Sequence, residues 1–104
     1  MFALIVAAMM MAAGGPESAR SSFTSCLKGS VAKAADAKIE PAGFAAFARQ
    51  SCASEVGAFR SWVIAYDMKA GWTRKKAEPD ADAQVADYLD EATEQYKSQQ
   101  PAAK

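Results

Sequence analysis

The two cysteines, Cys26 and Cys52, are the residues of this chain whose type and spacing most directly imply chemistry. They are equidistant from Ile39, and both flanks of Ile39 have the apolar spacing of amphipathic helices. In an antiparallel helical hairpin, positions equidistant from the turn lie side by side. The spacing therefore predicts a structural disulfide. A redox pair and two free thiols are the alternatives, and the C-x-x-C motif of thioredoxin-type sites is absent.

Catalytic and metal-binding constellations are not evident elsewhere in the sequence. The chain has no histidine, which removes the commonest general base and the imidazole metal ligands. Two thiolates alone do not complete a zinc site. The carboxylates of the last third lack the spacing of a calcium loop, so we expect them on a solvated helix face. They are Asp80, Asp82, Asp87, Asp90, Glu91 and Glu94. We predict no catalytic residue, no metal site and no cofactor.

A short basic stretch surrounds one tryptophan in the second half of the chain. Its members, besides Trp72, are Lys69, Arg74, Lys75 and Lys76. Basic and aromatic residues together can bind single-stranded nucleic acid. The stretch is short and the formal net charge is zero, so nucleic acid is not an expected partner. A solvated linker with helix C-terminal charge is one interpretation, and a protein-binding edge is the other.

The apolar spacing predicts three helices. The first covers about residues 18–37, the second about 41–70, and the third begins near Asp80 after a charged connection at 73–79. Pro41 suits the first turn of a helix, and Gly71 suits a left-handed C-cap. The expected fold is all-α: a disulfide-linked antiparallel helical hairpin plus a third helix, which together form a small three-helix bundle.

The far end of the long second helix is expected to need cover from the third. Folding back about Lys75 would bring Tyr88 near Trp62 and Ala92 near Phe59. The cover would be narrow, leaving some aromatic side chains partly exposed beside cations. The predicted partner surface comprises Trp62, Tyr66, Trp72, Arg74 and Lys75. The alternative is that both indoles are core or capping contacts.

The N-terminal run FALIVAAMMMAA is uncharged and too short to span a bilayer as a helix, which needs about 20 residues. Its length and the small residues after it predict a signal peptide at 1–14, followed by a single helical domain at 15–104. We therefore expect a periplasmic or secreted protein with no stable membrane insertion after cleavage. A buried N-terminal helix, an uncleaved anchor and a lipidated Cys26 are the alternatives.

Two stretches, SFTSCLKGSV and FARQSCASEVGAFRSWV, resemble a loosely defined group of small exported bacterial helical proteins with one cysteine per helix. That group implies export and a disulfide but no activity. The small periplasmic acid-stress chaperones are similar in size, helicity and possession of one disulfide.

The functional expectation is an exported, non-enzymatic helical protein that acts by binding an unknown protein partner. An envelope-stress chaperone or an enzyme inhibitor is the alternative. An enzyme ranks third, because no nucleophile, base and orienting group can be named together.

Overall fold

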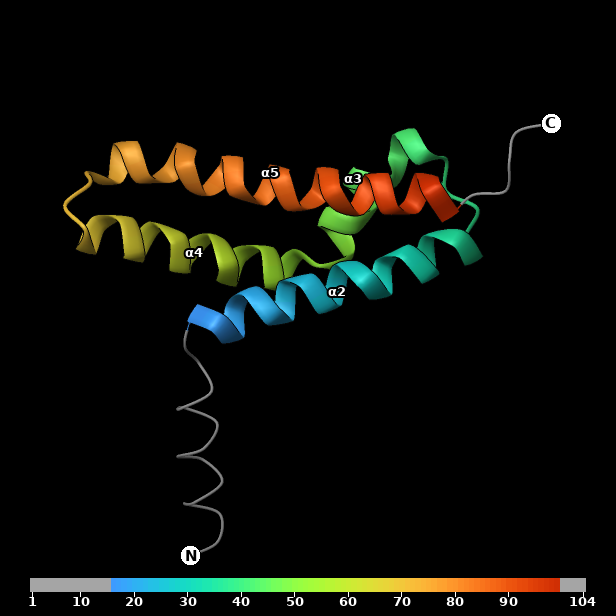
Figure 1. Cartoon of the computed structure of the whole chain (residues 1–104), viewed down its shortest axis with the longest axis horizontal. Helices are drawn as coiled ribbons and strands as arrows, with labels where there is room; N and C mark the ends of the chain where they lie inside the picture. Colours follow the sequence, from blue (N-terminus) through green and yellow to red (C-terminus); the bar gives the residue numbers. More distant parts are fainter. Residues whose placement is uncertain (1–15, 100–104) are drawn as a thin grey trace, which may run out of the picture.

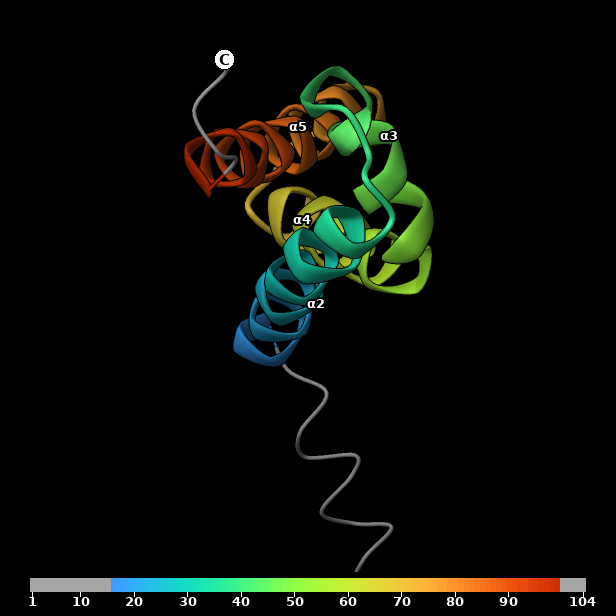
Figure 2. The ribbon, with the colours of Figure 1, turned by 90° about the vertical axis from the view of Figure 1, so that its right-hand side faces the viewer.

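The computed structural model of the chain describes residues 16–99, and that part contains four helices and no strand. The helices are α2 (Pro16–Asp36), α3 (Pro41–Ser51), α4 (Ala53–Lys69) and α5 (Arg74–Gln99). Figure 1 shows α4 running antiparallel to both α2 and α5. Figure 2 shows α3 beside the stack of the other three. The predicted all-α fold is confirmed, and the predicted signal peptide lies outside the described residues.

The number of helices differs from the prediction because the expected second helix is broken at Cys52. This residue has φ −111° and ψ 30°, outside the helical values. Its N–H donates to the Ala48 carbonyl at 2.8 Å, and its own carbonyl accepts from Val56 N–H at 2.8 Å. One residue thus ends α3 and begins α4. The bend lets α3 turn Phe44 and Ala48 into the core, where α3 packs on α5 and α2.

The third helix of the prediction also begins earlier than expected, at Arg74 rather than near Asp80. Thr73 is its N-cap: the Thr73 hydroxyl accepts from Lys76 N–H at 3.3 Å, and the Thr73 carbonyl accepts from Ala77 N–H at 2.9 Å. Pro79 lies inside α5 on an exposed face. Proline has no N–H for the carbonyl four residues earlier, and water can hydrogen-bond to that carbonyl instead. The first turns are retained because Ala77 and Ala81 are completely buried.

Both long connections begin with the same C-terminal cap. Gly71 has φ 106°, as its predicted role requires, and Trp72 N–H donates to the Asp67 carbonyl at 3.0 Å. Lys38, with φ 58°, does the same after α2, where Ile39 N–H donates to the Ala34 carbonyl at 3.0 Å. These are Schellman motifs, which satisfy the last carbonyls of a helix and reverse the chain.

Three aromatic rings join α2, α4 and α5 in the centre of the core. The centroids of Phe23 and Phe59 are 5.3 Å apart, and Tyr88 lies 5.3 Å from Phe59 and 5.6 Å from Phe23. Tyr88 therefore packs beside Phe59, about one helical turn from the expected contact with Trp62. The expected register assumed a turn at Lys75, whereas α5 has already begun there.

A second aromatic pair closes the end of the bundle near the first turn. The Tyr96 ring stacks on Phe44 with centroids 4.7 Å apart. Its hydroxyl donates a hydrogen bond to the Ile39 carbonyl. The last turns of α5 thus hold both α3 and the connection that precedes it.

Candidate functional site

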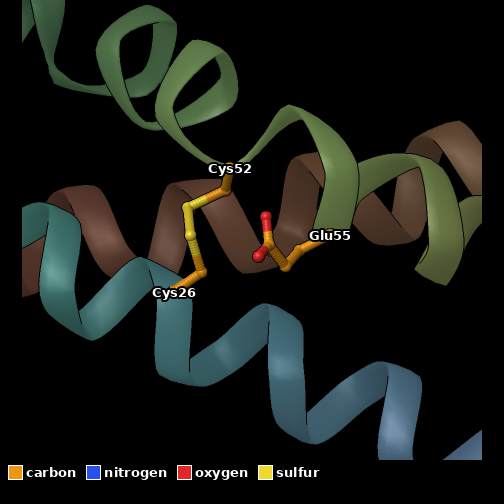
Figure 3. A group of neighbouring side chains, drawn as sticks. All are labelled: Cys26, Cys52 and Glu55. Atoms are coloured by element: carbon orange, nitrogen blue, oxygen red, sulfur yellow. A yellow bond between two sulfur atoms is a disulfide. The ribbon is translucent and has the colours of Figure 1, made fainter.

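The disulfide joins α2 to the break between α3 and α4 (Figure 3). The Cys26 and Cys52 sulfurs are 2.12 Å apart and the Cα atoms 5.9 Å apart, so the pairing predicted from their symmetry about Ile39 is confirmed. Cys52 is completely buried, while Cys26 is half-buried. The Ser30 hydroxyl lies one turn along α2, with its oxygen 3.3 Å from the Cys52 sulfur.

A carboxylate that no sequence motif indicates shares this site. Glu55 lies in the first turn of α4 and extends over the bridge, as Figure 3 shows. One of its oxygens and both sulfurs lie within 4.8 Å of one another. The relevant pattern is a glutamate three residues after Cys52. It becomes informative only once a helix is known to begin at Ala53, because Glu55 then projects from that helix's first turn.

A second candidate site lies where the start of α2 meets α4 and α5. Trp62 and Tyr66 are one turn apart on α4, with ring centroids 5.5 Å apart. They border a cavity of about 470 Å³, which we call the aromatic hollow. Trp62 is half-buried against Phe59, whereas Tyr66 is 61% exposed. The remaining walls are Glu17, Arg20, Val63, Asp67 and Gln84.

The floor of the aromatic hollow contains a buried carboxyl group. A hydrogen bond with the Asp80 side chain, followed by burial, raises the pKa of Asp67. Asp67 Oδ2 is buried, and no donor among the described residues reaches it. A proton on Asp67 can therefore be donated to Asp80, which also accepts from Gln84 Nε2 at 3.1 Å.

The other predicted surface residues lie apart from the aromatic hollow. Trp72 is 38% exposed, and the cation over its ring is Lys76, with Nζ 4.8 Å from the centroid. Arg74 Nε donates to Glu78 at 2.9 Å, and Arg74 lines a different groove, which includes Met68 on the opposite face of α4. Lys75 is exposed. Of the predicted surface, the structure places only Trp62 and Tyr66 together at this cavity.

Comparison with known proteins finds no matching family model, no matching curated protein and no matching solved structure. Between residues 16 and 99, no helix combines the length and the apolar character needed to cross a bilayer.

Proposed function

We propose that the chain is an exported, non-enzymatic helical protein, periplasmic or secreted, which binds a partner protein at the aromatic hollow. The observation that carries this proposal is the position of Tyr66. Its ring is 61% exposed, yet it stands beside a half-buried indole at the edge of a cavity. Tyrosine and tryptophan in such settings dominate the binding energy of protein interfaces.

The walls of the hollow indicate what the partner presents. Trp62, Val63 and Tyr66 supply apolar surface, and the Glu17–Arg20 ion pair, at 3.8 Å, lies on the rim. Asp67 and Gln84 add polar groups to the lining, and a mixture of apolar surface and polar groups is usual in protein interfaces. The partner is therefore a protein that packs an apolar side chain against Trp62, Val63 and Tyr66 and offers polar groups to the rest of the lining.

Site-specific cross-linking tests this proposal. A photoreactive phenylalanine at Tyr66 is compared with the same residue at Met68, a matched control that is 43% exposed on the opposite face of α4. In cells, we expect one stoichiometric adduct from position 66 and none from position 68. Many adducts of different mass would indicate a chaperone with several clients. Equal adducts from both positions, or none from position 66, would contradict the proposed surface.

Export is tested separately by mass measurement of the protein isolated from the cell envelope and the medium. The apolar run at 2–13 and the disulfide support an oxidising destination. We expect a mature chain that begins near Gly15. A full-length chain confined to the cytoplasm would contradict export.

A further inference from the structure

We propose that reduction of the disulfide converts Cys26, Cys52 and Glu55 into a binding site for a divalent, thiophilic metal ion, with Zn²⁺ as the probe. The inference does not depend on the aromatic hollow. It rests on the one cluster of metal-ligating atoms found among the described residues, in which the two sulfurs and a carboxylate oxygen lie within 4.8 Å of one another.

The spacing suits a single ion. Zinc binds sulfur at about 2.3 Å and carboxylate oxygen at about 2.0–2.2 Å, so two ligands of one tetrahedral ion lie roughly 3.5 Å apart. Breaking the S–S bond lets the sulfurs separate to that distance. Glu55 already points at them from the first turn of α4 (Figure 3), and rotation of its side chain brings an oxygen closer. The fourth position is left to water.

The surroundings support deprotonated sulfurs. Cys52 both ends α3 and precedes α4, so the two helix dipoles act on its sulfur in opposite directions, and the support comes from Ser30. The Ser30 hydroxyl lies 3.3 Å from the Cys52 sulfur and can donate a hydrogen bond to a thiolate, which orients a ligand from outside the coordination shell.

The negative charge of the three side chains is the reason to expect a cation at this site. Among the described residues, Glu55 forms no ion pair. Two thiolates and this carboxylate would place three negative charges together in a partly buried site. Either the thiols stay protonated or a cation neutralises them, and thiolate ligands select zinc over magnesium or calcium.

The chemical step is balanced by a dithiol reductant. The dithiol supplies two electrons and two protons, becomes a disulfide, and leaves Cys26 and Cys52 as thiols. Zn²⁺ then binds the two thiolates and displaces their two protons into solvent. The bridge and the metal exclude each other, so the site is open only in the reduced chain.

The test is a zinc titration of the full chain against a chromophoric chelator, after reduction with a phosphine and in the oxidised form. We expect one ion per reduced chain, two protons released, and no binding by the oxidised chain. Glu55→Gln should weaken zinc binding at least about tenfold, because mutating even the residues that orient zinc ligands costs about that much metal affinity. Glu91→Gln, an exposed glutamate of α5, is the control and should leave the affinity unchanged.

The Glu55→Gln result also separates a folded site from a pair of thiols in an unfolded chain, which would bind without regard to Glu55. Circular dichroism of the reduced chain is recorded alongside, and zinc should raise its melting temperature. Equal affinity of the reduced wild type and Glu55→Gln overturns the proposal. Absence of zinc binding by the reduced chain also overturns it.

Discussion

Two carboxyl groups on facing helices have opposite electrostatic surroundings. Asp67 on α4 is buried, and a hydrogen bond with Asp80, together with that burial, raises its pKa. Asp82 on α5 accepts from Arg60 Nε at 2.7 Å, and this hydrogen bond lowers the pKa of Asp82. The two residues should therefore influence stability with opposite dependence on pH.

Replacing Asp67 by Asn should stabilise the protein at pH 7. The folded-state pKa of Asp67 lies above the unfolded value of about 3.9, so the folded wild type loses stability as pH rises through the folded value. Asparagine does not ionise, and its amide can still donate to Asp80. Urea unfolding across a pH series should show an advantage for Asp67→Asn at pH 7 that closes below about pH 4. An advantage that grows in acid would contradict this.

Replacing Asp82 by Asn should have the opposite effect. Its folded-state pKa lies below the unfolded value, so its contribution is present above the unfolded pKa and is lost as pH falls. The same unfolding series should show Asp82→Asn less stable than wild type at pH 7 and equal to it in strong acid. Asp90→Asn removes the same charge from an exposed position of α5 and controls for net charge. A deficit equal to that of Asp90→Asn would mean that Arg60 contributes nothing.

Among the helices, the sequence predicts those boundaries and turns that are marked by particular residue types. Helix α2 is expected at 18–37 and observed at 16–36, and the turn at Ile39 correctly predicts the disulfide. The break at Cys52 is not predictable in this way. No glycine or proline marks residues 51–54, the apolar stripe continues across them, and any L-residue can adopt the backbone angles found there.

The other features that the sequence did not predict also depend on where helices begin and meet. Glu55 comes over the disulfide only because α4 begins at Ala53. The charge of residues 73–79 predicts a connection there, whereas the buried methyl groups of Ala77 and Ala81 keep this segment helical. Thr73 is of a residue type that favours the N-cap, and it is the signal in the sequence for the observed start. Likewise, the aromatic hollow depends on where three helices meet, which no one segment specifies.

Removing the disulfide should lower the stability of the helical hairpin but leave its helices formed. The bridge closes a loop between residues 26 and 52, for which loop-closure entropy gives about 3.5 kcal/mol. Cys26→Ser/Cys52→Ser should therefore lose about 2–4 kcal/mol of unfolding free energy. Denaturant unfolding measures the loss, and circular dichroism in water should show retained helicity. A loss below about 1 kcal/mol would mean that the bridge contributes little to stability.

Two glycines of the α4 segment should respond oppositely to alanine. Gly71 has φ 106°, which an L side chain adopts at a penalty of roughly 1–2 kcal/mol, so Gly71→Ala should destabilise by about that amount. Gly57 is helical and exposed, and a Cβ there meets nothing within 4 Å. Gly57→Ala should stabilise by about 0.5–1 kcal/mol. Thermal melting of both variants measures the two effects. A shift of the same sign in both would contradict the different backbone roles assigned to Gly71 and Gly57.

At the scale of the whole molecule, the core depends on few large side chains. Phe59 is 1% exposed and contacts rings from both α2 and α5. Phe59→Ala should lower the unfolding free energy by about 3–5 kcal/mol, close to the total of about 5 kcal/mol expected for a domain of this size. Tyr66→Ala, at an exposed position of the same helix, should change it by less than about 0.5 kcal/mol. Comparable losses in both variants would place Tyr66 in the core rather than at a binding surface.

The hydrogen bond from Tyr96 to the Ile39 carbonyl links residues separated by 57 positions. In a nascent chain that does not yet include Tyr96, the Phe44 ring is uncovered and the Ile39 carbonyl lacks its hydrogen-bond donor. The molecule therefore completes this end of its core only after Tyr96 has been synthesised. For a protein proposed to leave the cytoplasm, a chain that has not yet closed this end would pass more easily through a secretion channel. Removal of the α5 turns that carry Tyr96 would reopen the same end of the bundle.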